Sequence, residues 1–158
     1  MEVEDDDIDG IIISIVMKNF FCHDNFRVDF NKNVTYLVGC NGSGKSAVVT
    51  ALTVGLGGKA SATNRGTNLS SFIKKGADSA SVEIKIKNSS PMAYKHEIYG
   101  DSITVIHDFS MSGSSTYKVK SHSGLPVVTT LNIQINFITI HNHYVFNLLR
   151  QTQHARTN

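Results

Sequence analysis

The sequence contains few cysteines and no long hydrophobic run. Cys22 and Cys40 are its two cysteines, so it has neither a disulfide framework nor the paired-cysteine spacing of a zinc site. The longest apolar run, IIISIVM, ends before Lys18 and is far shorter than a bilayer span. The first nine residues, MEVEDDDID, are acidic, which excludes a secretory signal or a basic transit peptide. We therefore expect an intracellular chain with two free thiols, in the cytosol or the nucleus.

Acidic residues are absent from the last third of the chain and concentrated at its start. Six of the 13 acidic residues lie in residues 1–9, and none follows Asp108. Without that segment, 15 basic residues face the remaining 7 acidic ones, a net charge of +8. We expect residues 1–9 to be a disordered acidic tail, because a dense run of like charge repels itself. The basic remainder could approach a polyanion, and ordinary solubilising charge is the alternative.

The first half of the chain predicts strands followed by one helix. Residues 11–17, 26–30 and 34–38 have the β-branched or alternating apolar patterns of strands, and the third leads directly into a glycine-rich stretch. Residues 44–56 predict a helix with one apolar side. The following Gly57-Gly58 pair ends it, because glycine adopts the left-handed cap conformation without steric cost.

The second half predicts a different architecture. A polar loop at 59–70 and a short helical turn at 70–75, stopped by Gly76, precede segments in which apolar and polar residues alternate. This period of two, seen between residues 82 and 120, predicts an antiparallel meander of about three or four strands. The 158 residues are sufficient for one domain with its own core.

The stretch GCNGSGKS, residues 39–46, fits the phosphate-loop pattern GxxxxGK[ST] at every fixed position. Glycines at 39, 42 and 44 permit positive φ and a close approach of backbone N–H groups to phosphate oxygens. The helix that begins near Gly44 adds its N-terminal partial charge, and Lys45 can reach the β- and γ-phosphates. The Ser46 hydroxyl is a suitable Mg²⁺ ligand. The sequence therefore predicts binding of ATP and Mg²⁺, against the alternative of a simple glycine turn.

Three segments resemble the N-terminal ATPase head of the structural maintenance of chromosomes (SMC) family. They are MKNFFCH (17–23), VGCNGSGKSAVVTALTVGLGGKA (38–60) and ATNRGTNLSSFIKKG (62–76), and the resemblance covers roughly residues 10–136. The stretches TNRG and GLGGKA are most similar to the subunit-six branch, which acts with subunit five in recombinational DNA repair and chromosome maintenance. The resemblance implies an α/β fold of the ATP-binding-cassette type, with a central mixed sheet, a P-loop helix and an antiparallel meander. It also implies nuclear, chromosomal location and four kinds of partner: DNA, the subunit-five head, non-SMC subunits and the C-terminal lobe of a full-length chain.

The same resemblance assigns roles to individual residues. Ser46 would coordinate Mg²⁺, and the nucleotide would be bound by Gly39, Cys40, Asn41, Gly42, Ser43, Gly44, Lys45, Ser46, Ala47 and Val48. Arg65 would belong to an arginine loop near nucleotide and DNA, with Lys59, Lys74 and Lys75 around it and no acid between them in sequence. Solvated surface charge is the alternative for these four residues. For His23, packing or hydrogen bonding at a strand end is a better hypothesis than catalysis.

Several parts of an SMC ATPase are missing from the sequence. It has no hydrophobic run ending in Asp-Glu, no serine-glycine-glycine signature and no coiled coil. NIQIN (132–136) resembles a family stretch, but Gln151 and Gln153 do not match the family glutamine that follows it. We therefore expect an incomplete half-domain at 10–130 that binds ATP without completing hydrolysis, followed by a divergent, poorly folded tail at 131–158. A truncated gene product is our hypothesis for this arrangement.

Two alternatives and one weak motif remain. A stand-alone P-loop kinase would need a lid with arginines after the helix, where this sequence has strand patterns instead. A non-catalytic interaction fragment is the second alternative. His141, His143 and His154 form a weak metal-ligand pattern in a stretch that has neither glycine nor proline.

Overall fold

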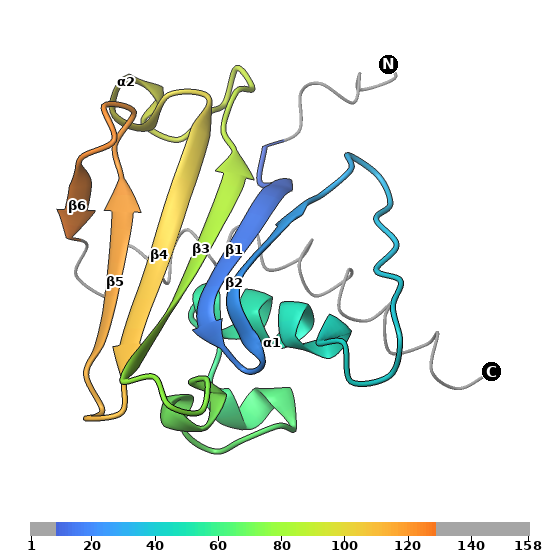
Figure 1. The fold of residues 1–158 in the computed structure, drawn as a ribbon. Coiled ribbons are helices and arrows are strands. Elements are labelled where there is room, and N and C mark those ends of the chain that lie inside the picture. The colour runs from blue at the N-terminus through green and yellow to red at the C-terminus, as the bar shows by residue number, and fades with distance from the viewer. Residues whose placement is uncertain (1–8, 129–158) are drawn as a thin grey trace.

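One antiparallel sheet with a single long helix on one face makes up the fold (Figure 1). The computed structural model describes residues 9–128. The six strands follow the order β2-β1-β3-β4-β5-β6, and every adjacent pair is antiparallel. Residues 1–8 and 129–158 lie outside the described part, and with them nearly all of the acidic tail, the whole divergent tail and the histidine pattern predicted above.

The elements agree with most of the predicted pattern. The strands are β1 (Ile12–Phe20), β2 (His23–Asp29), β3 (Ser79–Lys87), β4 (Ser102–Ser110), β5 (Ser115–Lys120) and β6 (Pro126–Val128). The helices are α1 (Lys45–Gly55) and α2 (His96–Tyr99), with 3-10 turns η2 (Ala60–Thr63) and η3 (Leu69–Phe72). The predicted P-loop helix and the meander, which has four strands, are confirmed. The helical turn predicted at 70–75 begins one residue earlier and ends at Phe72.

The core forms where α1 lies against the sheet. Alternate residues of β3 and β4 are buried, because successive side chains of a strand point to opposite faces. In β1 the adjacent Ser14 and Ile15 are both buried, next to a register shift between Ile12 and Ser14. Ile15, Val82 and Ile84 are fully buried, and a β-carbon at Gly55 of α1 would lie 2.6 Å from Cδ1 of Ile84. Glycine at this position therefore allows α1 to approach the strands closely.

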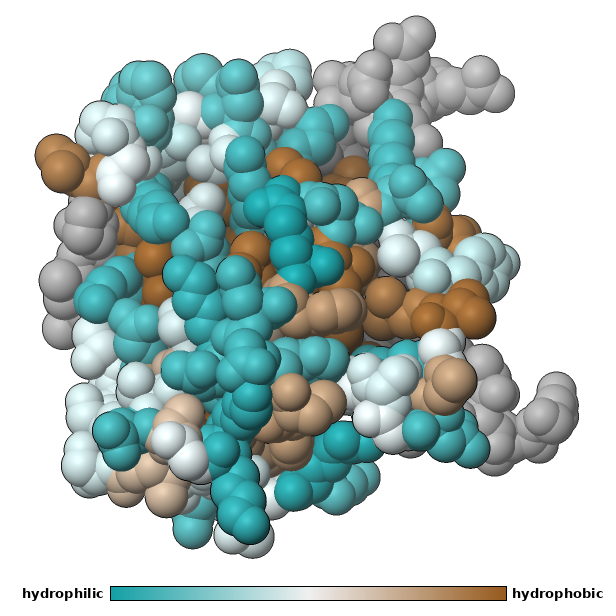
Figure 2. Space-filling view, viewed as in Figure 1, coloured by the Kyte–Doolittle hydropathy of each residue, from teal (hydrophilic) through white to brown (hydrophobic). Residues whose placement is uncertain are grey.

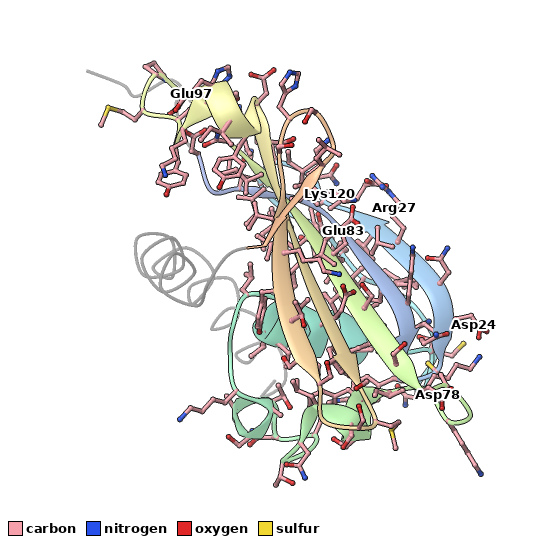
Figure 3. The ribbon with its side chains drawn as sticks, turned by 90° about the vertical axis from the view of Figure 1, so that its left-hand side faces the viewer. Asp24, Arg27, Asp78, Glu83, Glu97 and Lys120 are labelled. Carbon is pink, nitrogen blue, oxygen red and sulfur yellow. The ribbon has the colours of Figure 1, made fainter. Side chains whose placement is uncertain are left out.

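The opposite face of the sheet is polar. Lys118 pairs with Asp108 at 2.8 Å, and Lys120 on β5 pairs with Glu83 on β3 at 2.9 Å. Figure 3 shows Lys120, Glu83 and Arg27 together on the side away from α1. Charged and apolar residues alternate along the meander strands because only one side of the sheet faces the core.

The C-terminal end of α1 is fixed by its cap and by the meander. Gly57 adopts a φ of 91°, and the N–H groups of Gly57 and Gly58 donate to the carbonyls of Val54 (3.3 Å) and Thr53 (2.8 Å). This is the Schellman arrangement that the Gly-Gly pair predicts. His107 Nδ1 and Tyr117 Oη also lie 2.9 and 2.8 Å from the Val54 carbonyl. Burial lowers the pKa of His107 to about 4 and raises the pKa of Tyr117 to about 12.

The strand predicted at 34–38 is wrong. These residues form no strand, and the sheet of the described residues is antiparallel throughout rather than mixed. Val34, Tyr36 and Val38 are 56%, 84% and 93% exposed, whereas Thr35 and Leu37 are partly buried. A strand needs a neighbour for its backbone groups. Here the alternating pattern remains without a strand partner, so the segment runs along the side of the molecule as an irregular connection (Figure 1).

Candidate phosphate-binding loop and its surroundings

The glycines of the loop at 39–46 have two different structural roles. Gly42 and Gly44 adopt φ values of 84° and 87°, in the left-handed region that favours glycine. Gly39 does not, which corrects our expectation of positive φ at all three positions. A β-carbon at Gly39 would instead lie 2.6 Å from the Ser43 hydroxyl oxygen, so a side chain there would displace that hydroxyl group.

The Lys45 side chain is hydrogen-bonded to the backbone of the phosphate loop. Its ammonium group donates to the carbonyl oxygen of Gly39 and, at 2.7 Å, to that of Cys40. The Ser43 N–H closes a turn onto the Cys40 carbonyl at 3.2 Å. Cys40, Asn41, Gly42 and Ser43 are exposed, and both cysteines are free thiols. The lysine ammonium group is therefore held by two backbone carbonyls of a short, accessible loop.

The side chains in the first turn of α1 differ in burial. Ala47 and Val48 are each 1% exposed, so their side chains belong to the core and only their backbone groups face the N-terminal end of the helix. The Ala47 N–H donates to the Gly44 carbonyl at 2.8 Å. Ser46 is partly buried in this turn, and its carbonyl accepts the Thr50 hydroxyl at 3.1 Å.

The residues present fit a triphosphate and its divalent cation. Two left-handed glycines, a lysine over the loop and a helix N-terminus form a concentration of positive partial charge. Ser46 offers the hard oxygen that Mg²⁺ prefers. Among the described residues, no group of three or more His, Cys, Asp or Glu side chains could hold a metal on its own.

The structure brings two of the four predicted basic residues to one place. The Arg65 guanidinium carbon lies 5.6 Å from the centre of the Phe21 ring, and Lys74 forms an ion pair with Asp24. Phe21 and Asp24 both lie at the tip of the β1–β2 hairpin, where Figure 3 labels Asp24. An acid therefore lies beside Lys74 in space, although none lies between the basic residues in sequence. Both predicted contacts with DNA remain predictions.

Lys59 and Lys75 lie apart from these hairpin contacts. Lys59 immediately precedes η2, and Lys75 lies in the turn before Gly76. Both side chains are exposed, and neither forms an ion pair with a described residue. They remain basic surface residues near Arg65 and Lys74 in sequence, without a shared contact in the structure.

His23 contacts the phosphate loop, and the sequence did not predict this contact. Its ring stacks on Phe26 with centroids 4.5 Å apart, so the predicted packing role is confirmed. A β-carbon at Gly44 would collide with His23 Nε2 and lie 3.1 Å from Sγ of Cys22. Nε2 is closed off from solvent and has no hydrogen-bond partner within residues 9–128. The sequence indicated this contact only through the family resemblance, which includes both MKNFFCH and the phosphate loop.

Comparison with known proteins agrees with this geometry. A family described as an AAA domain matches residues 14–157. Human structural maintenance of chromosomes protein 6 is 50% identical over 121 residues, which are 76% of this chain and 11% of the human protein. The corresponding protein of Schizosaccharomyces pombe is 41% identical over 132 residues, 84% of this chain and 12% of that protein. The chain spans about a tenth of the length of the curated relatives it matches.

Solved structures of SMC heads share the fold. One, from work on ATP-driven dimerisation and DNA-stimulated activation of SMC ATPases, has a TM-score of 0.66 and 25% identity, covering 81% of this chain and 77% of that one. An Smc head domain from Pyrococcus furiosus, bound to the C-terminal domain of ScpA, has a TM-score of 0.65 and 25% identity. It covers 81% of this chain and 32% of that one. None of the helices found between residues 9 and 128 has the length and apolarity needed to cross a bilayer.

Proposed function

Because this chain belongs to the AAA-domain family and is an SMC-type ATPase head lobe, we propose that it binds ATP with Mg²⁺ through residues 39–46. The observation that carries the proposal is the loop itself, with Gly42 and Gly44 in the left-handed region and Lys45 held over the carbonyls of Gly39 and Cys40. Backbone N–H groups would contact phosphate oxygens, Lys45 would neutralise phosphate charge, and Ser46 would coordinate the cation. When bound, the nucleotide supplies the phosphoanhydride whose hydrolysis drives SMC-type ATPases.

The chain is proposed to need residues from elsewhere to complete hydrolysis. Its sequence has no Asp-Glu ending a hydrophobic run and no signature serine-glycine-glycine. Val34, Tyr36 and Val38 form an exposed, extended segment without a strand partner, directly before the loop. Hydrophobic surface also gathers on the side of the molecule along which this segment runs (Figure 2). These features support the C-terminal lobe of a full-length SMC chain as the partner that adds strands here.

DNA is the second proposed ligand. The relatives are named structural maintenance of chromosomes proteins, which points to DNA. In this chain, four basic residues lie in one sequence stretch after α1: Lys59, Arg65, Lys74 and Lys75. If all four contact phosphates, log Kd would depend on log salt with a slope of magnitude about 3 to 4. Lys74 has to exchange Asp24 for phosphate, so its contribution to DNA affinity is expected to be the smallest of the four.

We propose that the protein acts in the nucleus, on chromosomes, in DNA repair by recombination. Its proposed protein partners there are a subunit-five head and non-SMC subunits.

Nucleotide-dependent thermal stability tests the proposed site. A ligand that binds only the folded state stabilises it by RT ln(1 + [L]/Kd), so binding at about millimolar affinity is visible. We expect Mg-ATP to raise the midpoint for the native chain and to leave Lys45→Ala unchanged. Lys95→Ala is the matched control, because Lys95 lies beside Tyr94 at the far end of the sheet. An equal shift in the native chain and Lys45→Ala would contradict the assignment.

The alternatives make different predictions. A kinase would transfer phosphate from labelled ATP to a small acceptor, whereas an SMC-type lobe would not. A non-catalytic interaction fragment would co-purify with a full-length SMC partner but show no nucleotide-dependent shift. The relatives and the meander strands that follow α1 favour the SMC-type lobe over both.

A further inference from the structure

The exposed phosphate loop contains an asparagine that is followed directly by glycine. Asn41-Gly42 is the only Asn-Gly pair in the sequence. Both residues are exposed, and a β-carbon built on Gly42 would meet no heavy atom of the described residues within 4 Å, apart from its chain neighbours. Glycine carries no side chain that would hinder an approach to its backbone nitrogen. The Gly42 nitrogen is therefore open to the Asn41 side chain beside it.

Asparagine is a thermolabile residue type, and an accessible Asn-Gly pair can undergo deamidation. The backbone nitrogen of Gly42 attacks the side-chain carbonyl carbon of Asn41, so that an N–C bond forms and the bond to the amide NH2 group breaks. Ammonia leaves with the proton of the Gly42 N–H, and a cyclic succinimide remains. Water then opens the ring at either carbonyl and gives aspartate or isoaspartate. The reaction consumes water, releases ammonia and needs neither an oxidant nor a reductant.

Hydrogen bonds hold the loop around this pair but leave the reacting groups free. The Ser43 N–H and the Lys45 ammonium group donate to the Cys40 carbonyl at 3.2 and 2.7 Å. Among the described residues, the Asn41 amide and the Gly42 N–H have no hydrogen-bond partner. The structure therefore offers no contact that would have to break before the Gly42 nitrogen attacks.

Asn88, which is followed by Ser89, has the opposite environment. It is 2% exposed, and its side-chain amide donates to two backbone carbonyls at 3.0 and 2.8 Å. The Ser89 N–H, which would have to attack, donates to the Asp9 carboxylate at 2.7 Å. Deamidation at Asn88 therefore requires local opening of the structure. The chain thus contains its own comparison for Asn41.

Either product of deamidation at residue 41 would weaken phosphate binding. Aspartate places a negative charge where the loop would receive phosphate oxygens, which are also negative. That carboxylate would also attract the Lys45 ammonium group, which is held at the adjacent Cys40 carbonyl. Isoaspartate adds a methylene group to the backbone before Gly42, and so moves the N–H groups that follow.

Bound phosphate would in turn protect the pair. In the proposed site, backbone N–H groups of the loop donate to phosphate oxygens. A Gly42 N–H that is engaged in this way is not free to attack Asn41. Deamidation then proceeds only in chains without nucleotide, so its rate is proportional to 1/(1 + [L]/Kd).

We propose that Asn41 is a deamidation site, that its conversion to aspartate or isoaspartate switches off nucleotide binding at residues 39–46, and that bound nucleotide slows the conversion. The chemistry at Asn41 depends on the loop alone, whereas the two statements about nucleotide rest on the proposed function. A loop that stays empty progressively loses the ability to bind, and an occupied loop keeps its asparagine.

Mass spectrometry of tryptic peptides from the full 158-residue chain tests the site. Trypsin cleaves on both sides of residues 33–45 and 88–95, so one digest reports on both asparagines, and fragment ions distinguish Asn41 from Asn33. During incubation at mildly alkaline pH, conversion of amide to carboxylate should be about tenfold or more faster at Asn41 than at Asn88. Asn41→Gln should abolish it in peptide 33–45, because the longer side chain has to close a larger ring. Equal rates at Asn41 and Asn88 in the folded chain overturn the inference.

Nucleotide provides the second comparison. With Mg-ATP at about ten times its Kd, about one chain in eleven has an empty loop, so the rate at Asn41 should fall about tenfold. The rate at Asn88 should not change. An unchanged rate at Asn41, in a chain whose thermal midpoint Mg-ATP raises, overturns the inference. If Mg-ATP does not raise the midpoint, the proposed function fails, whereas faster reaction at Asn41 than at Asn88 still supports the deamidation site.

A variant that carries the product tests the consequence for binding. Asn41→Asp should weaken Mg-ATP binding by about fivefold or more, the effect of a like charge at about 4 Å in water. Asn33→Asp is the matched control, because Asn33 is exposed in the same peptide but lies before the loop. It adds the same charge and should keep the native Kd. An Asn41→Asp variant that binds Mg-ATP with the native Kd overturns the proposed switch.

Discussion

The two ends of α1 differ in how completely the chain packs around them. At the C-terminal end, the Val54 carbonyl lies within hydrogen-bond distance of His107 and Tyr117, and the Gly57-Gly58 cap closes the last turn. At the N-terminal end, the loop and the segment before it are exposed, and Val38 is 93% accessible. We call the sheet with the C-terminal half of α1 the packed region and residues 31–43 the loop region. The contrast indicates that the packed region determines stability, whereas the loop region is available for binding.

The largest expected contrast comes from matched aromatic truncations. Phe20 is fully buried between Phe72 and Phe109, whereas Tyr36 is 84% exposed. Phe20→Ala should reduce the free energy of unfolding by about 3 to 5 kcal/mol, and Tyr36→Ala should change it by less than about 0.5 kcal/mol. Urea denaturation of both variants measures the difference. Comparable losses would show that residues 31–43 are packed as tightly as the sheet.

Acid should destabilise the packed region through His107. Burial lowers the pKa of His107 to about 4, so between about pH 6.5 and 4 the unfolded chain binds a proton that the folded chain does not. Stability from this group is present above pH 6.5 and is lost as the pH falls toward 4, by about 3 kcal/mol. His107→Phe keeps a ring beside Tyr117 and should remove this part of the slope. Denaturation at several pH values checks it, with exposed His122→Gln as the control; an unchanged slope in His107→Phe would refute the assignment.

The cap of α1 should have an intermediate effect. Gly57→Ala places a β-carbon at a φ of 91° and should reduce stability by about 1 to 2 kcal/mol. Ser61→Ala, at an exposed position in η2, provides the neighbouring control. Thermal unfolding of both variants measures the contribution of the cap. A loss at Gly57 no larger than that at Ser61 would mean that the helix end tolerates another geometry.

The smallest effect is expected on the outer face of the sheet. Lys118 and Asp108 are each a little over one-third exposed, so solvent screens their 2.8 Å pair. A double-mutant cycle with Lys118→Met and Asp108→Asn should give a coupling of about 0.2 to 1 kcal/mol that decreases with added salt. A coupling that salt leaves unchanged would indicate that this face is covered rather than open.

The sequence predicted elements that depend on local pattern. The period of two gave the meander, and the Gly-Gly pair gave the end of α1, since each depends on nearby residues alone. The strand at 34–38 failed because strand formation requires a pairing partner, and the described chain offers none beside it. The short α2 was not predicted either. It has only four residues, and it follows Lys95, which has a φ of 41°. The sequence pattern predicts neither this short helix nor this backbone conformation.

The sequence predicted which kind of site residues 39–46 form, but it did not predict which side chains lie around that site. The pattern GxxxxGK[ST] fixed which residues form the loop, but it did not predict that Gly39 lacks a positive φ and lies close to the Ser43 hydroxyl. The contacts of His23 with Gly44 and of Arg65 with Phe21 join segments distant in sequence. Such contacts follow from how β1, β2 and η3 pack together, which period and spacing do not specify.

The central proposal is that residues 39–46 hold the phosphates of ATP and that the chain needs residues from elsewhere to hydrolyse it. Calorimetric titration of the 158-residue chain with Mg-ATP, combined with measurement of released phosphate, tests both halves. We expect saturable binding that is lost in Lys45→Ala, with no phosphate release above the buffer rate. Binding that survives Lys45→Ala, or steady turnover that this substitution abolishes, would contradict the account.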